Sequence, residues 1–217
     1  MTVFRNVFPK TIQAGEKEMT DHLIPANEES EKIQLRAERI IKDSGVITAW
    51  RSIGAEINLV GSARMGLMAK RRDIDFHIYT DPFSLADSFR AMALLAEKSA
   101  IRMITFANLL DAEDRCLEWH ATWLDEAGES WQIDMIHILK DSLYAGYFER
   151  VAERISATLT PETRAAILRI KFSIPDAKNE PGIRIYRAVI EGGVRDLASF
   201  YEWEKLNPMQ GIEKGMP

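Results

Sequence analysis

Residues 59–79 read LVGSARMGLMAKRRDIDFHIY, and this stretch decides the fold. It predicts a short apolar strand, a tight turn at Gly61 and Ser62, a short helical or looped piece, and a second strand that carries Asp73 and Asp75. Alternate side chains of a strand point to the same face, so these two carboxylates project together, about 7 Å apart. Two acids this close repel each other, and a divalent metal with oxygen ligands is the usual compensation.

The turn before that strand suits a phosphate group. Gly61 lets the backbone pass close to a ligand, and Ser62 opens a possible helix whose free N–H groups bind anions. A phosphate site beside metal-binding carboxylates is typical of enzymes that catalyse phosphoryl or nucleotidyl transfer. The stretch therefore predicts a site for that chemistry.

Length and composition narrow the class of protein. The chain has 217 residues, which favours one domain or a domain with a modest helical appendage. The net charge of −5 weakens the case for a dedicated nucleic-acid binder. The single cysteine, Cys116, excludes an internal disulfide framework and a cysteine-based zinc site, and it favours a reducing compartment. Since no run of 18 apolar residues and no signal-peptide core occur, we expect a cytoplasmic protein without a membrane span.

Hydrophobic periodicity predicts an α/β (α+β) fold: a mixed sheet of about five strands flanked by helices, followed by a helical C-terminal region. The predicted strands cover residues 56–60, 73–80, 101–106, 117–124 and 131–139. The predicted helices cover 27–45, with Asn27 or Ser30 as the cap, then 46–50, 84–98, 144–156, 161–172 and 183–205, the last of which Gly192-Gly193 could split. The expected organisation is an arm packed on the body (1–26), a sheet domain (27–140), a helical region (141–207) and a loose tail (208–217).

Asp134 lies within a stretch, residues 131–138, that is otherwise almost wholly apolar and that predicts a strand buried on both faces. A lone carboxylate in such a strand costs several kcal/mol unless it is paired or bound to a metal. One or two Mg²⁺ ions shared by Asp73, Asp75 and Asp134 would compensate all three acids together.

These residues resemble a known family. Gly61-Ser62, then ten residues, then Asp73-Ile74-Asp75, with a third Asp on a later strand, is similar to the nucleotidyltransferase superfamily to which DNA polymerase β belongs. Gly66 also matches a glycine of its small stand-alone members. The resemblance covers roughly residues 55–139 and extends only loosely to the helical C-terminus.

The resemblance implies residue roles. Asp73 and Asp75 would bind two Mg²⁺ ions, with Mn²⁺ as an alternative, and Asp134 would share the second ion and help to activate the attacking hydroxyl. Gly61 and Ser62 would hold the β- and γ-phosphates of an NTP. The reaction would transfer a nucleoside monophosphate to an acceptor hydroxyl and release pyrophosphate.

Several nearby side chains are weaker candidates for the site, and each also has a simpler structural interpretation. Arg64, Arg72, Lys140 and Lys171 could contact phosphates, although such residues are usually solvated surface cations. His77 shares the face of Asp75 and could touch the nucleotide or play a structural role. His137 falls on the face opposite to Asp134 and is expected to be a core histidine, and the spacing does not support a zinc site formed by His137 with His120. Four aromatic residues could stack on a base, but core packing explains them better: Trp119, Trp123, Tyr144 and Tyr147.

The expected partners are an NTP, with ATP only the commonest choice, and an acceptor that is a small molecule, such as an antibiotic, or a protein. The acidic balance disfavours a nucleic acid as acceptor. Two other functions stay open: a catalytically silent member of the fold that binds a nucleotide or a protein, and a metal-dependent phosphohydrolase or nuclease. A capped turn and two solvent-facing acids would explain Asp73 and Asp75 without any function, but would explain Asp134 poorly.

Overall fold

Strand β5 (Ser130–Ile138) is the central strand of a five-stranded sheet in the computed structural model, which describes residues 23–208. The strand order is β1-β2-β5-β4-β3, and the other strands are β1 (Glu56–Val60), β2 (Asp73–Tyr79), β3 (Ile101–Leu109) and β4 (Cys116–Leu124). β2 and β5 run parallel, whereas the other neighbouring pairs are antiparallel. The predicted mixed sheet of five strands is therefore confirmed.

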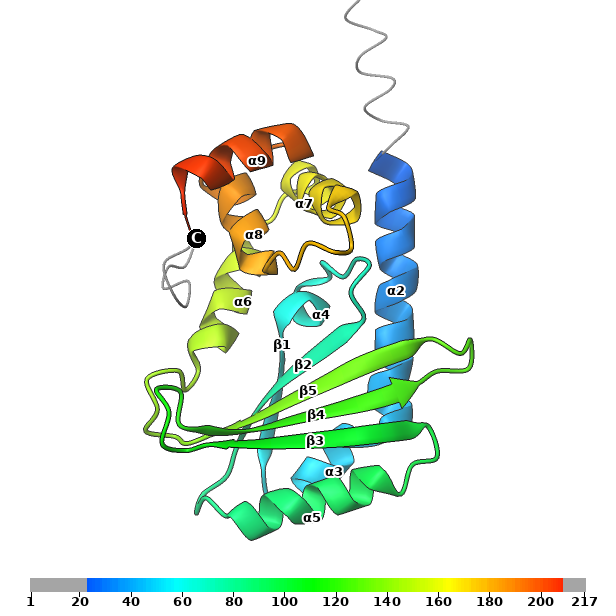
Figure 1. Ribbon diagram of the computed structural model, residues 1–217, viewed down its shortest axis with the longest axis vertical. Helices are drawn as coiled ribbons and strands as arrows, with labels where there is room; N and C mark the ends of the chain where they lie inside the picture. The colour runs from blue at the N-terminus through cyan, green and yellow to red at the C-terminus, as the bar shows by residue number, and fades with distance from the viewer. Residues whose placement is uncertain (1–22, 209–217) are drawn as a thin grey trace, which may run out of the picture.

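One face of the sheet is covered by helices from the first half of the chain (Figure 1): α2 (Leu23–Ser44), α3 (Val46–Arg51) and α5 (Leu85–Ala96). The strand residues that alternate toward this face are large and apolar, as a half-buried sheet requires. Buried members of this core include Trp50 from α3, Phe76 from β2, Leu95 from α5 and Met135 from β5.

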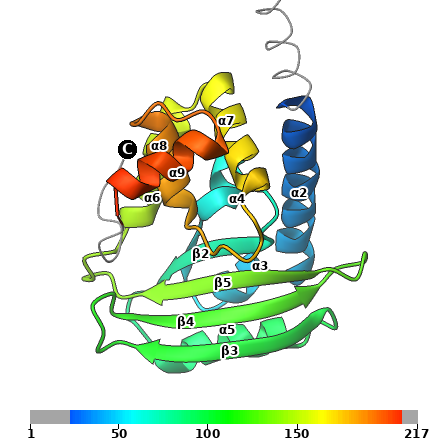
Figure 2. The ribbon, with the colours of Figure 1, turned by 45° about the horizontal axis from the view of Figure 1, so that its top comes forward.

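The opposite face is overhung by helices from the second half of the chain (Figure 2). The short α4 (Gly61–Met65) follows β1, and α6 (Tyr147–Thr158), α7 (Pro161–Ser173), α8 (Gly182–Ile190) and α9 (Leu197–Leu206) form a layer with its own buried core. That core includes Leu67, Ile167, Val189 and Phe200. The predicted C-terminal helical region is present, with a break between α8 and α9.

Two expectations about local structure were wrong. Helix α2 begins at Leu23, so Asn27 and Ser30 lie inside it and do not cap it; the Ser30 hydroxyl instead donates to the carbonyl of Met68 (2.7 Å). Strand β5 is buried on one face only, because residues such as Gln132 on its other face are exposed. The expected N-terminal arm and C-terminal tail fall largely on residues 1–22 and 209–217, outside the described residues.

Within residues 23–208, no helix combines the length and the apolar composition that crossing a bilayer requires.

Truncating the centre of the sheet tests this arrangement. Ile133 in β5 is 0% exposed, so Ile133→Ala should lower the free energy of unfolding by about 2–5 kcal/mol through lost burial and an unfilled cavity. Met103 on the edge strand β3 is 55% exposed, so Met103→Ala should change it by less than about 0.5 kcal/mol. Denaturant titration measures both values, and equal losses would contradict the strand order.

Candidate active site

Three carboxylates occupy neighbouring positions of two adjacent strands, on the face of the sheet that the second-half helices overhang. Asp75 on β2 is paired in register with Asp134 on β5, and Asp73 is paired with Gln132. Neighbouring strands lie about 4.8 Å apart, and Asp73 shares the face of Asp75 because it lies two residues before it. The fold thus brings together the three acids that the sequence singles out, and each is half-buried.

Gly61 packs its backbone against the Asp75 side chain. It follows Val60, the β1 partner of Asp75, and begins α4 with a φ of +64°. A Cβ atom at this position would lie 2.2 Å from Oδ2 and 3.0 Å from Cγ of Asp75. Both the backbone conformation and the close approach therefore require glycine here.

The acids concentrate negative charge where water is scarce. The pKa of Asp75 is raised to about 7, chiefly by burial and further by the carboxylates of Asp73 and Asp134, whereas the ammonium group of Lys171 acts in the opposite direction. Carboxylate oxygens on adjacent strands are the donors that Mg²⁺ prefers, and a divalent ion would relieve the charge repulsion. Asp73, Asp75 and Asp134 therefore fit a magnesium site by the chemistry of their donor atoms.

Asp134 already has partners from the protein. The Nδ1 atom of His120 lies 2.6 Å from Oδ1 of Asp134, and the amide of Gln132 donates to both carboxylate oxygens (2.8 and 3.1 Å). The Asp134 side chain is also 17% exposed. The sequence requires either a partner or a metal for Asp134, and the structure supplies His120 and Gln132 as partners.

The contact of His120 with Asp134 is the feature of the site that the sequence did not predict. Burial lowers its pKa, but the hydrogen bond to Asp134 and the attraction of Asp134 and Glu118 outweigh burial, so the pKa of His120 is raised overall. Its place beside Asp134 follows from the β4–β5 register, which pairs these two residues directly. Only knowledge of that register could have identified His120 from the sequence.

Lys171 joins the helical region to the phosphate turn. From α7 its ammonium group donates to the hydroxyl of Ser62 (3.2 Å), the carbonyl of Leu67 (2.6 Å) and the hydroxyl of Tyr186 (3.2 Å). A cation thus lies directly beside the Gly-Ser turn, 109 residues away from Ser62 along the chain. Of the four predicted cations, Lys171 is the one that contacts this turn through a hydrogen bond.

Two cavities flank the acid pair of β2. A cavity of about 260 Å³ contains Asp73 and Asp75 in its wall and is otherwise lined mainly by apolar and aromatic side chains, among them Tyr147, Phe148 and Tyr186. A cavity of about 430 Å³ is also lined by Asp73 and is rich in cations, which come from residues 70–72, α2, α7 and the segment after α7. The acids therefore lie between an apolar and a basic compartment.

The other predicted cations lie at different distances from the acids. Arg72 lines the larger cavity and forms an ion pair with Glu129. Arg64 is exposed on α4 and is not among the lining residues of either cavity. Lys140 follows the far end of β5, where it pairs with Asp81 (3.4 Å), so the structure does not bring Lys140 to the carboxylates.

The two remaining strand histidines are packed inside. His77 is buried against Phe148 and lies 3.4 Å from Glu149, which gives it a structural contact. His137 is 0% exposed, lies 2.9 Å from the hydroxyl of Thr80, and has its pKa lowered to about 4 by burial. His137 is the core histidine that the alternation of the strand predicts.

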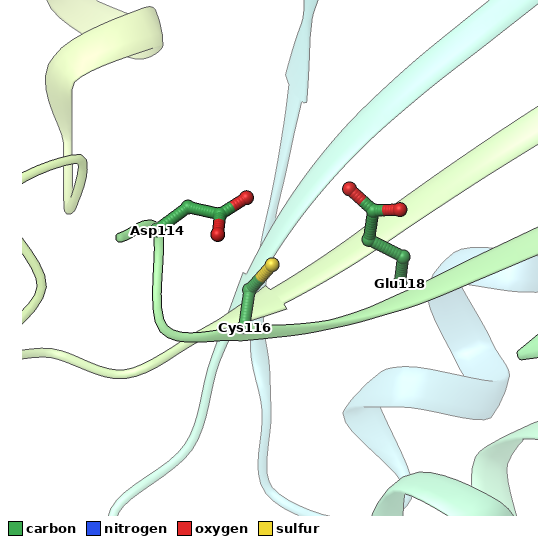
Figure 3. Close-up of side chains that lie close together, drawn as sticks. All are labelled: Asp114, Cys116 and Glu118. Carbon is green, nitrogen blue, oxygen red and sulfur yellow. The ribbon is translucent and has the colours of Figure 1, made fainter. Parts of the chain in front are cut away.

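A separate group of metal-ligand side chains lies at the start of β4 (Figure 3). Asp114, Cys116 and Glu118 point toward one another, with their ligand atoms within 4.8 Å. Burial raises the pKa of Cys116 to about 12, and the neighbouring Asp114 adds to this shift. The thiol is therefore protonated at neutral pH and would have to lose its proton to bind a metal ion.

No family model and no curated protein sequence matches the chain. Solved structures do match: a mutant of Cid1 poly(U) polymerase bound to MgATP aligns with a TM-score of 0.56 and 16% identity over 80% of this chain and 55% of that one. Cid1 poly(U) polymerase bound to MgGTP aligns with a TM-score of 0.52 and 18% identity over 71% and 47%.

The poly(A) polymerase of the GLD-2–GLD-3 complex aligns with a TM-score of 0.52 and 8% identity over 88% of this chain and 60% of that one. The chain therefore spans about half to three fifths of the length of these structures. At this low identity the likeness establishes the fold alone, which is the fold predicted from the Gly-Ser turn and the acids.

Asp75 should make stability depend on pH. Its pKa is about 7 in the folded chain and near 3.8 when unfolded, so the folded state binds more protons between these values. The free energy of unfolding should therefore fall as pH rises from about 4 to 7, by up to about 4 kcal/mol at 1.36 kcal/mol per pKa unit. In EDTA, Asp75→Asn should remove most of this fall in denaturant titrations at pH 5 and pH 8. An unchanged pH dependence in the variant would contradict the shift.

The close approach of Gly61 can be separated from its backbone conformation. Gly66 has a similar φ of +66° but open space where a Cβ would lie. Gly66→Ala should lose about 1–2 kcal/mol of unfolding free energy through backbone strain alone. Gly61→Ala should lose at least about 1 kcal/mol more, because Asp75 must also move. Equal losses in denaturant titration would show that Gly61 does not press on Asp75.

Proposed function

We propose that this chain, which has the fold of the nucleotidyltransferase superfamily, is an enzyme that transfers a nucleoside monophosphate from an NTP to an acceptor hydroxyl. The observation that carries the proposal is the clustering of Asp73, Asp75 and Asp134 beside the Gly61-Ser62 turn. A domain that only bound a partner would gain nothing from three half-buried acids placed next to one another.

The donor would occupy both compartments around the acids. Asp73, Asp75 and Asp134 would hold Mg²⁺, which supplies Lewis-acid stabilisation of the charge on the transferred phosphoryl group. The backbone of the Gly61-Ser62 turn and the ammonium group of Lys171 would bind phosphate oxygens.

The nucleoside would lie in the 260 Å³ cavity. Tyr147 and Phe148 from α6 and Tyr186 from α8 offer aromatic surface to a base there. This cavity shares the side chains of Asp73 and Asp75 with the proposed metal site, so a nucleoside in it would place its 5′ phosphates beside the acids. Labelling with each NTP in turn identifies the preferred base.

Asp134 would take the proton of the acceptor hydroxyl. His120 and Gln132 hold its carboxylate in one orientation, and strands β4 and β3 extend the sheet beyond it (Figure 2). An acceptor on this side would approach the α-phosphate from the face that the basic cavity does not occupy. That placement suits in-line displacement of the leaving phosphates.

The acceptor surface favours a small molecule or a protein over a nucleic acid. The β4 positions on the face of Asp134 include no lysine or arginine; they are Cys116, Glu118, His120, Thr122 and Leu124. A phosphate backbone would meet repulsion there rather than the cations that bind it. The similar structures are poly(U) and poly(A) polymerases, so an RNA end is the alternative that the experiment must separate.

Labelling identifies donor and acceptor together. The chain with Mg²⁺ is incubated with each α-labelled NTP and, separately, with small molecules, proteins or RNA from a cell extract. Transfer of label with release of pyrophosphate supports the proposal, and label on RNA would overturn the acceptor assignment. Release of free nucleotide or phosphate without any labelled acceptor would indicate a hydrolase, and binding without turnover a silent member.

Removing single acids should abolish transfer. Asp73→Ala should lower the rate of label transfer about 10³-fold, because a lost metal ligand removes several kcal/mol of transition-state stabilisation. Asp134→Asn should lose most activity while keeping a folded chain. Asp141→Asn is the matched control, because Asp141 is 70% exposed and pairs with Arg115 outside the site. Near-normal transfer by Asp73→Ala would refute the site.

A further inference from the structure

We propose that the 430 Å³ cavity binds the phosphate chain of the donor beyond its α-phosphate and has room for three such phosphates. The inference rests on the proposed function and specifies its donor class. Nucleoside 5′-tetraphosphates would then be donors alongside triphosphates, with triphosphate rather than pyrophosphate as the leaving group.

The two cavities are placed to share one ligand. Ser62, Asp73 and Gly182 line both of them, so their walls meet at the Gly-Ser turn. A nucleoside in the apolar cavity has its phosphates at this turn, and a longer chain continues past it toward Lys171 and residues 70–72. The aromatic residues lie on one side of Asp73 and the cations on the other. The base of the ligand would therefore lie in the apolar cavity and its phosphate chain in the basic one.

The charge of the larger cavity suits a polyanion. Among the described residues that line it, six are cations and four are acids, in a chain whose net charge is −5. The cations are Arg36, Lys70, Arg71, Arg72, Lys171 and Lys178, and the acids are Glu29, Asp73, Asp176 and Glu180. Lys171 and Arg71 contribute most, because their hydrogen bonds go to neutral partners: Arg71 reaches the carbonyl of Lys178 (3.5 Å).

The volume exceeds what pyrophosphate needs. A phosphoryl group has four heavy atoms. If each atom takes the volume of one water molecule, about 30 Å³, one group takes about 120 Å³. The cavity of about 430 Å³ therefore holds about three phosphoryl groups. The leaving group of an NTP has two. The cavity therefore has space for one further phosphate. Arg71 lies in the cavity wall and offers that phosphate a cation, whereas the Gly61-Ser62 turn contains no charged side chain.

The wall of the cavity is tied together before any ligand binds. Lys70 donates to the carbonyl of Ile174 (2.5 Å) and pairs with Asp176 (2.7 Å), which fastens the segment before β2 to the loop after α7. The bond from Arg71 to Lys178 joins the same two segments. A site whose cations are already positioned loses less entropy when it binds a flexible phosphate chain.

The transfer step keeps its chemistry with the longer donor. The acceptor oxygen forms a bond to the α-phosphorus, the bond from that phosphorus to the bridging oxygen of the β-phosphate breaks, and the acceptor proton goes to Asp134. The electron pair of the broken bond leaves with the bridging oxygen on inorganic triphosphate, and no oxidant or further reactant is needed.

Calorimetry on the full chain with Mg²⁺ tests the cavity independently of turnover. Tripolyphosphate should bind at least tenfold more tightly than pyrophosphate. Arg71→Ala should remove most of that difference and barely change pyrophosphate binding. Arg90→Ala, an exposed arginine on α5 at the other face of the sheet, is the matched control and should change neither. Equal affinities for the two anions, or equal effects of the two variants, would overturn the proposal.

A transfer assay separates this inference from the proposed function. The 5′-tetraphosphate of the preferred nucleoside should have a kcat/KM at least equal to that of the triphosphate, and Arg71→Ala should lower the first at least fivefold more than the second. Transfer from the triphosphate but not from the tetraphosphate overturns the inference and leaves the function standing. Absence of transfer from both refutes the proposed function and, with it, the donor assignment.

Discussion

The burial of Asp75 beside two other carboxylates is the constraint on which the site depends. Parallel pairing of β2 with β5 places Asp75 against Asp134, and the backbone of Gly61 closes the third side. This arrangement disfavours the charged form of Asp75 and raises its pKa to about 7, because the group is buried and lies beside the carboxylates of Asp73 and Asp134. A bound divalent cation would convert this unfavourable arrangement into a strong ligand set.

The helical layer completes what the sheet begins. Lys171 reaches from α7 to Ser62, and the aromatic residues of α6 and α8 form the apolar cavity beside the acids. Neither the sheet nor the helices alone would contain both a phosphate turn and a base-sized pocket. The core of the sheet and the core of the C-terminal helices are separate, so a ligand can enter the space between the two layers.

Features set by residues close in sequence were predictable, and so was the placement of Asp134 beside Asp73 and Asp75, because an acid in an apolar strand requires compensation. Other contacts between strands were not predictable. The Gly61-Ser62 turn and the alternation of Asp73 and Asp75 follow from local rules of turns and strands, and the helix boundaries near Pro161 and Gly192-Gly193 follow from the same rules. The pairing of His120 with Asp134 depends on register, and the exposure of one face of β5 depends on which helices cover it. Lys140 failed to reach the site because its strand runs away from the acids.

The most direct test of the account is a crystal structure with Mn²⁺ and a non-hydrolysable NTP analogue, with the metal located by anomalous scattering. We expect anomalous peaks bounded by the carboxylates of Asp73, Asp75 and Asp134, with the analogue's phosphates against Gly61 and Ser62. Peaks confined to other carboxylates, such as Asp114 and Glu118, with the three strand acids free of metal, would contradict it.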